Sequence, residues 1–222
     1  MKVGTDGVLL GAWCAVDNYP DSILDIGAGT GVLSLMLAQR SDAMTIDAVE
    51  LDENAYEQTV ENFESSDWGD RLYCYNASFQ EFADEILAEE ETYDLIVSNP
   101  PFYTDTFETS DESRNKARFT SSLSFQELLL GVSKILSDAG RFSVILPFKE
   151  KEIFLSIAKE NKLFLNRFCS VQGNESSAIK RILLEFSFHV SEIIETHLVI
   201  ETGRHQYTEA YKNLTQAFYL KM

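Results

Sequence analysis

The sequence predicts an α/β protein built on a doubly wound, mostly parallel sheet of seven strands. Short apolar segments alternate along the chain with segments of helical periodicity, an order typical of such sheets. The first apolar segment, residues 22–26, leads into a glycine-rich turn and then into a helical stretch at residues 32–39. A turn of this kind places backbone N–H groups beside the carboxyl end of a strand, where open α/β sheets bind their ligands.

Each further element follows from local signals. A polar turn at Thr5–Gly7 precedes a short apolar helix that reaches Trp13. Further strands are predicted at residues 44–49, 71–75, 93–97, 141–146, 163–171 and 180–189. Further helices are predicted at residues 53–64, 79–90, 124–136, 149–160 and 208–216. Ser78 suits the N-cap of the second of these. Residues 103–122 are polar and without periodicity, so we expect a substrate-side loop there, within one domain spanning residues 1–222.

Composition limits the possible classes of protein. The 222 residues suffice for one domain with a sizeable core, and no apolar run is long enough to span a membrane. The first residues do not resemble a secretory signal, so we expect a cytoplasmic protein that acts as a monomer. Three widely separated cysteines form no C-x-x-C pair, which argues against a zinc site and for core positions; they are Cys14, Cys74 and Cys169.

Charge is distributed unevenly along the chain. The net charge of −18 argues by itself against a nucleic-acid partner. Residues 1–113 carry 3 basic and 25 acidic side chains, whereas residues 114–222 carry 15 basic and 11 acidic ones. A modest basic face built by the second half is therefore compatible with RNA, although charge alone does not point to it.

The glycine-rich turn has the spacing G-x-G-x-G, at Gly27, Gly29 and Gly31. A dinucleotide-binding turn has G-x-G-x-x-G instead, so the spacing disfavours a nucleotide oxidoreductase. Asp25 precedes the glycines, and Glu50 follows Gly31 at about the distance at which an acid meets ribose hydroxyls. The pattern D-x-G-x-G-x-G resembles motif I of the Rossmann-like class I methyltransferases that use S-adenosylmethionine (SAM). A glycine turn with a purely structural role is the alternative.

A second motif, Asn99-Pro100-Pro101-Phe102, follows the fourth predicted strand. Prolines fix φ and remove N–H donors, so this stiff rim presents its carbonyls to a ligand. The Asn99 side-chain oxygen and a proline carbonyl can together accept both hydrogens of an exocyclic amino group. Phe102 supplies a face on which a planar group can stack. A plain strand-terminating turn is the alternative.

Together these motifs resemble the amino-methyltransferases, which methylate an exocyclic or amide nitrogen. The segment Met1–Trp13 is more specific, because it resembles the segment before motif I in the bacterial tRNA1(Val) adenine N6-methyltransferases. Lys180-Arg181 and the ending Tyr207–Leu220 are also similar to that family, so the resemblance runs nearly end to end. In the family an aromatic, lysine-containing segment usually precedes the counterpart of Met1, and a chain that starts here is expected to bind RNA less tightly.

The resemblance implies SAM as the cofactor, no metal, and methyl transfer to N6 of adenosine 37 in the anticodon loop of a valine tRNA. It assigns the cofactor site to residues that line the methionine and ribose, order the loop or close over it: Thr5, Asp6, Asp25, Gly27, Gly29, Gly31, Glu50 and Asn99. Ala77 and Ser78 stand where relatives often have an acid at the cofactor adenine, so we expect the Ala77 backbone to recognise that adenine instead.

The mechanism implied by the resemblance is a direct SN2 transfer. Asn99 and Pro100 accept both N6 hydrogens and aim the nitrogen at the sulfonium methyl, within a catalytic motif that also contains Pro101. Phe102 supports the target base once it has left its stack. RNA contacts are expected from five basic residues, for each of which solvated surface is the alternative: Arg114, Lys116, Arg118, Lys180 and Arg181.

Two other functions stay open. A protein glutamine N5-methyltransferase of the release-factor type uses a similar Asn-Pro-Pro motif on an amide nitrogen. Such proteins usually carry a separate N-terminal helical domain, for which this chain has no room. The other is a SAM- or RNA-binding module without catalysis, which the intact Asn99–Phe102 motif disfavours.

Overall fold

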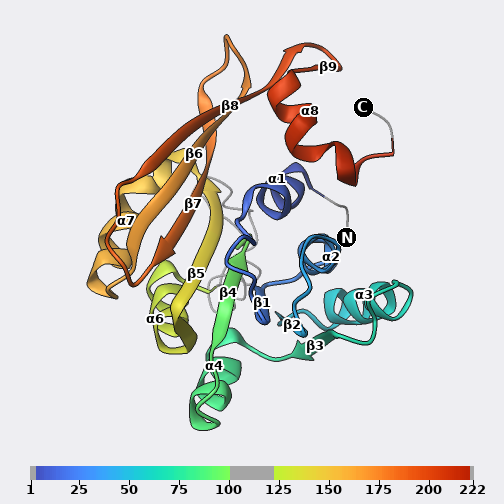
Figure 1. The fold of residues 1–222 in the computed structure, drawn as a ribbon, viewed down its shortest axis with the longest axis vertical. Helices are drawn as coiled ribbons and strands as arrows, with labels where there is room; N and C mark the ends of the chain where they lie inside the picture. The colour runs from blue at the N-terminus through green and yellow to red at the C-terminus, as the bar shows by residue number, and fades with distance from the viewer. Residues whose placement is uncertain (1–3, 101–122, 221–222) are drawn as a thin grey trace, which may run out of the picture.

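The computed structural model describes residues 4–100 and 123–220. Nine strands form one sheet with the order β3-β2-β1-β4-β5-β7-β6-β8-β9 (Figure 1). The strands are β1 (Ser22–Ile26), β2 (Thr45–Glu50), β3 (Leu72–Asn76), β4 (Tyr93–Ser98), β5 (Leu136–Pro147), β6 (Phe164–Asn174), β7 (Ile179–Ser187), β8 (Ile194–Gly203) and β9 (Gln206–Tyr207). The doubly wound α/β fold is thereby confirmed, with two more strands than the predicted seven.

Helices cover both faces of the sheet, which gives three layers (Figure 1). One face carries α1 (Thr5–Trp13), α2 (Val32–Arg40), α3 (Glu53–Glu64) and α8 (Glu209–Thr215). The other carries α4 (Phe79–Ala88), α6 (Phe125–Ile135) and α7 (Lys151–Glu160), and the 3-10 turns η1 (Phe148–Glu150) and η2 (Gln216–Phe218) complete the fold. Because both faces are covered, the central strands are buried and read as continuous apolar runs.

Register in the parallel half of the sheet brings three loops to one edge. Ile26, the last residue of β1, pairs with Val49 of β2 and with Ser98 of β4. The residues that follow these three positions therefore leave the sheet side by side. Strand order changes direction between β1 and β4, and such a switch point is where α/β sheets bind ligands.

The C-terminal part of the chain extends the sheet beyond the expected strands. β8 pairs in parallel with β6, and the short β9 pairs antiparallel with β8. We did not predict β8, because its first four residues are exposed and its sequence lacks the alternation of a half-buried strand. Along the chain, α8 follows β9 and packs back on α1 and α2 through Leu214, beside Val8 and Met36.

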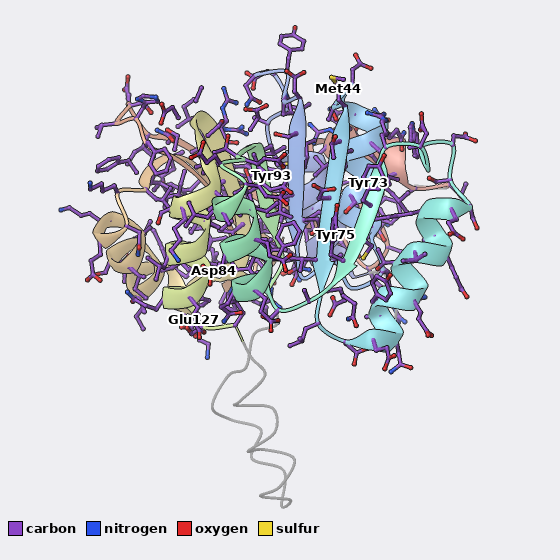
Figure 2. All side chains as sticks on the ribbon, turned by 90° about the horizontal axis from the view of Figure 1, so that it is seen from below. Met44, Tyr73, Tyr75, Asp84, Tyr93 and Glu127 are labelled. Carbon is purple, nitrogen blue, oxygen red and sulfur yellow. The ribbon has the colours of Figure 1, made fainter. Side chains whose placement is uncertain are left out.

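Opposite this extension, the outer part of the sheet stays open beside α4. Figure 2 shows Tyr73, Tyr75 and Tyr93 on the same face of the sheet. Tyr73 and Tyr75 of β3 remain about half exposed, whereas Tyr93 is buried and its hydroxyl donates to Asp47 at 2.6 Å. Within residues 4–100 and 123–220, no helix has the length and apolar character needed to cross a membrane. The predicted substrate-side loop, 103–122, lies outside the described residues.

Candidate functional site

The glycine turn between β1 and α2 adopts the backbone that its sequence requires. Gly27, Gly29 and Gly31 have φ values of 74°, 62° and 72°, which residues with a Cβ rarely adopt. A Cβ on Gly31 would lie 2.6 Å from the Phe63 ring, so this glycine packs the turn against α3. A Cβ on Gly27 would meet nothing within 4 Å. The open side of the turn at Gly27 thus has space for a ligand to approach the backbone.

Asp25 holds the turn from inside the protein. Its Oδ2 accepts hydrogen bonds from the Ser34 backbone N–H at 3.2 Å and from the Ser34 hydroxyl at 2.7 Å. Burial raises the pKa of Asp25 to about 7, although the two hydrogen bonds from Ser34 act in the opposite direction. Asp25 therefore binds the first turn of α2, just after the glycine turn, without facing solvent.

Glu50 stands beside the glycine turn at the carboxyl end of β2. Its Oε2 accepts from the Gly29 N–H at 2.8 Å, and its Oε1 accepts from the Asp52 N–H at 2.9 Å. Two side chains of α3 hold the turn from the other side: Thr59 donates to the Gly29 carbonyl at 3.1 Å and Asn62 donates to the Thr30 carbonyl at 2.8 Å. These last two contacts have no local signal in the sequence, because the α3 residues lie about 30 positions away from the turn.

Asn99 and Pro100 follow β4 beside the start of the glycine turn, because Ser98 pairs with Ile26. Pro100 is buried and Asn99 is partly buried. Gly7 of α1 lies near both the first residue of α2 and Asn99, because a Cβ placed on it would be 3.4 Å from Val32 and 3.9 Å from Asn99 Nδ2. The start of α1 thus stands over the edge of the sheet where the glycine turn and Asn99 meet.

An ion pair ties this start of α1 to β7. Arg181 Nε donates to Asp6 Oδ2 at 2.7 Å, and Arg181 faces Pro147 at the carboxyl end of β5. Thr5 and Lys180, the chain neighbours of this pair, are exposed. We predicted Asp6 for the cofactor and Arg181 for RNA, and the pairing between them was not foreseen.

Ser78 has a structural task in addition to any contact with a ligand. It is the N-cap of α4, as predicted, and forms a capping box with Glu81. The Ser78 hydroxyl accepts from the Glu81 N–H at 3.2 Å and donates to the Glu81 carboxylate at 2.6 Å. Ala77 is partly buried and packs against the core.

The remaining predicted site residues lie outside the described residues: Pro101, Phe102, Arg114, Lys116 and Arg118. The cysteines occupy apolar positions, and burial raises the pKa of Cys14 to about 11 and that of Cys74 to about 12. Within the described ranges, no group of three acidic, histidine or cysteine side chains is placed to bind a metal ion. A cavity of about 550 Å³ is lined by Trp13, Arg40 and Arg167 and by the residues just before β1. It therefore lies at the end of β1 that is away from the glycine turn.

The fold and the turn define a Rossmann-like class I methyltransferase. Residues 11–118 match the family model described as the methyltransferase small domain. A solved structure, that of a predicted O-methyltransferase from Agrobacterium tumefaciens, superposes with a TM-score of 0.72 at 18% identity and covers 96% of each chain. At that identity the likeness concerns the fold.

The chain belongs to the tRNA1(Val) (adenine(37)-N6)-methyltransferase family. A curated member from Christiangramia forsetii is 55% identical over 222 residues, which are all of this chain and 92% of the relative. A second member, from Flavobacterium johnsoniae, is 54% identical and is covered to 94% of its length. The family resemblance predicted from the Met1–Trp13 segment and the two motifs is thereby confirmed.

Proposed function

We propose that this chain transfers a methyl group from SAM to N6 of adenosine 37 in the anticodon loop of tRNA1(Val). The observation that carries the proposal is the meeting of the glycine turn, Glu50 and Asn99 at one edge of the sheet, in a member of a family that is named for this reaction. We further infer that it acts as a single-domain, cytoplasmic monomer.

The residues at this edge fit the cofactor. Gly27 leaves open space over a backbone that only glycine adopts readily, and Glu50 places a carboxylate beside it for the ribose hydroxyls. Asp6, in the first turn of α1, supplies a carboxylate for the cationic methionine end. The Ala77 backbone, at the end of β3, is our candidate for the adenine. Bound SAM would supply an electrophilic methyl group.

Asn99 and Pro100 would act on the nucleophile. The lone pair of an adenine amino group is delocalised into the ring, so the free amine attacks poorly. If Asn99 Oδ1 and the Pro100 carbonyl accept both hydrogens, the lone pair would be localised on the nitrogen. It would then point toward the methyl group. Positioning and electrostatics then provide the rate enhancement. As the N–C bond forms, S-adenosylhomocysteine would be the leaving group, and the nitrogen would release one of its two protons to solvent. Pro101 and Phe102 complete this motif, with Phe102 as the stacking surface for the flipped base.

RNA is proposed to approach from the side of β7 and of the segment after Phe102. Lys180 is exposed beside Arg181, and we assign both to phosphate groups together with Arg114, Lys116 and Arg118. These five cations belong to the basic second half of the sequence, which limits repulsion between RNA and a chain of net charge −18.

The test is methyl incorporation into unmodified valine tRNA, followed by mass spectrometry of the nucleosides. Asn99→Ala should lower kcat by at least about 100-fold, because the side-chain acceptor acts in the transition state, while SAM affinity changes little. Asn166→Ala is the matched control, because Asn166 lies on β6 and donates to the His189 carbonyl. Undiminished activity in Asn99→Ala would refute the role of Asn99, and methyl groups found only on protein would favour the glutamine methyltransferase instead.

A further inference from the structure

Phe148 is a large aromatic side chain that stays exposed at the ligand-binding edge of the sheet. It is the first residue of η1, directly after β5, and is 37% exposed. Ser98 of β4 pairs with Val144 of β5, so Asn99 is level with Ile145. Phe148 therefore lies three residues further out, a rise of up to about 10 Å. When a base is held at Asn99, this distance is within reach of the next nucleotide, or the one after it, in an RNA strand whose bases are splayed apart.

Lys180 of β7 lies beside Phe148. β5 and β7 are antiparallel, and Pro147 pairs with Arg181. The next residues outward are therefore Phe148 and Lys180, and η1 packs against β7 in agreement with this register. Lys180 also stands at a β-bulge, because the pairing of β7 with β6 skips it between Ile179 and Arg181. A bulge turns a side chain out of the regular alternation, and Lys180 is exposed.

Two further lysines stand near the same end of the sheet. Lys149 of η1 is exposed and meets Glu150 at 3.5 Å, a pair that solvent weakens. The Lys151 ammonium lies 4.8 Å from the centre of the Phe168 ring, which holds it at the start of α7. Among the described residues, neither Lys151 nor Lys180 forms an ion pair. We call Lys149, Lys151 and Lys180 the three edge lysines.

The area around Phe148 is positive although the chain is acidic. Residues 147–152 and 179–182 carry four basic and two acidic side chains. Asp6 neutralises Arg181, which leaves the three edge lysines against two glutamates. A single exposed aromatic residue is common on protein surfaces. Phe148 differs because it combines an exposed ring, a cationic surrounding and a place beside the proposed catalytic motif.

We propose that Phe148 is a stacking platform for an unpaired nucleotide close to the target adenosine, and that the three edge lysines bind the phosphates beside it. The inference rests on the proposed function of the site. Single-stranded RNA presents planar bases on a charged backbone, and proteins bind it with aromatic faces among cations. The target base itself belongs to the Asn99–Phe102 motif, so Phe148 serves a different nucleotide of the anticodon loop. A base that stacks on Phe148 no longer stacks on its neighbour, which lowers the cost of flipping the target.

A purely structural role of Phe148 makes a different prediction. If the ring served only to close the end of β5, its removal would disturb the edge of the sheet and weaken the binding of cofactor and RNA together. If the ring stacks on a base, its removal weakens RNA binding alone. The two affinities, measured separately, therefore distinguish the two roles.

The first experiment measures binding of a fluorescent, unmodified valine anticodon stem-loop with saturating S-adenosylhomocysteine, which has no methyl to transfer. Phe148→Ala should bind the RNA about tenfold more weakly, as expected for one lost stacking contact, and Phe148→Trp should bind it like the wild type. Tyr73→Ala is the matched control, because Tyr73 is an exposed aromatic residue on the outer strand β3. Calorimetry should give the same S-adenosylhomocysteine affinity for all variants. A parallel loss of that affinity in Phe148→Ala would assign a structural role and overturn the proposal.

The second experiment identifies the stacked nucleotide. In a series of stem-loops, one loop nucleotide at a time lacks its base. The wild type should lose affinity when the base that stacks on Phe148 is absent, and this loss should disappear in Phe148→Ala because the platform is already gone. Tyr73→Ala should retain the wild-type profile. Losses that are additive with Phe148→Ala at every position of the loop would rule out stacking on Phe148.

The third experiment tests the three edge lysines through the salt dependence of RNA binding. Each replacement of an edge lysine by glutamine should weaken binding and lower the slope of log affinity against log salt by about 1. Lys159→Gln and Lys162→Gln are controls, because these exposed lysines stand at the other end of α7. Slopes that do not differ between the two groups would contradict phosphate binding by the edge lysines.

Failure of the two proposals is distinguishable. A wild-type protein that neither binds nor methylates the valine stem-loop overturns the proposed function and the stacking platform with it. Normal methylation by the wild type, together with equal RNA affinities of Phe148→Ala and Tyr73→Ala, overturns the stacking platform alone.

Discussion

At the scale of single residues, Asp25 shows how one buried carboxyl group holds the start of α2, just after the glycine turn. It is fully buried and meets both the N–H and the hydroxyl of Ser34. An aspartate in the unfolded chain has a pKa of about 3.9, whereas burial raises the pKa of Asp25 to about 7. The folded protein therefore keeps a proton that the unfolded chain releases between these two values.

This difference predicts a dependence of stability on pH. Because the folded state binds more protons, the contribution of Asp25 to the free energy of unfolding falls as pH rises from about 4 to about 7. Asp25→Asn cannot ionise and still accepts from Ser34, so it should gain stability relative to the wild type across this window, by up to about 4 kcal/mol. Denaturant titrations at several pH values measure the difference.

Asp17 provides a control, because its pKa is shifted in the opposite direction to that of Asp25. Its hydrogen bond with Arg141 lowers its pKa, so its stabilising contribution is present above the unfolded pKa and is lost as pH falls through the lower, folded value. Asp17→Asn should therefore show its full deficit above about pH 5, and this deficit should shrink as pH falls below that value. A constant difference between Asp25→Asn and the wild type from pH 4 to pH 8 would contradict the burial argument.

At the scale of elements, two helices begin with the same device. α4 starts with Ser78 and Glu81, and α6 starts with Ser124 and Glu127, each pair forming a capping box. Such a box satisfies N–H groups that the first turn of a helix leaves without partners. A serine directly before a helical stretch predicts the N-cap at Ser78, and the structure shows in addition the box that it forms with Glu81.

Because the two caps are alike, comparing the same substitution at Ser78 and at Ser124 separates a structural role of Ser78 from a role in cofactor binding. Ser78→Ala and Ser124→Ala should each lower the free energy of unfolding by about 1 kcal/mol. SAM affinity should change less than twofold in both, because the Ser78 hydroxyl is engaged with Glu81 and the Ala77 backbone remains. Calorimetry and denaturant unfolding give the two quantities, and a large loss of affinity confined to Ser78→Ala would assign its hydroxyl to the cofactor.

At the scale of the whole molecule, a partly buried ion pair joins distant parts of the chain. The Glu185 side chain of β7 is only 3% exposed and meets Arg167 of β6 at 3.1 Å. The same carboxylate accepts from the Ala15 N–H and from Ser143 of β5. The Arg167 guanidinium lies 4.5 Å from the centre of the Trp13 ring at the end of α1. One cluster thus connects the segment after α1 with three strands of the second half.

Removal of one partner of this ion pair should therefore lower the free energy of unfolding substantially. Arg167→Met leaves the Glu185 charge buried without a cation, and we expect a loss of about 3–5 kcal/mol in the free energy of unfolding. The double variant Arg167→Met with Glu185→Gln removes the charge as well and should recover much of that loss. Denaturant unfolding of both variants measures the recovery, and a loss below about 1 kcal/mol in Arg167→Met would show that the pair contributes little.

The sequence by itself determined the features that local residues encode. The glycine turn follows from three residues that must take positive φ, the caps follow from serine and glutamate three residues apart, and the central strands follow from continuous apolar runs. The family assignment also follows from short motifs, each within a dozen or so residues.

Only the tertiary structure decided which distant residues meet. The pairing of β8 with β6, the contacts of Thr59 and Asn62 with the glycine turn, and the Asp6–Arg181 pair join positions between 27 and 175 residues apart. No local pattern encodes such contacts, because the packing of whole elements sets them after each element has formed. This is why the sequence predicts Asp6 and Arg181 as two separate candidate site residues, whereas in the fold their side chains form an ion pair.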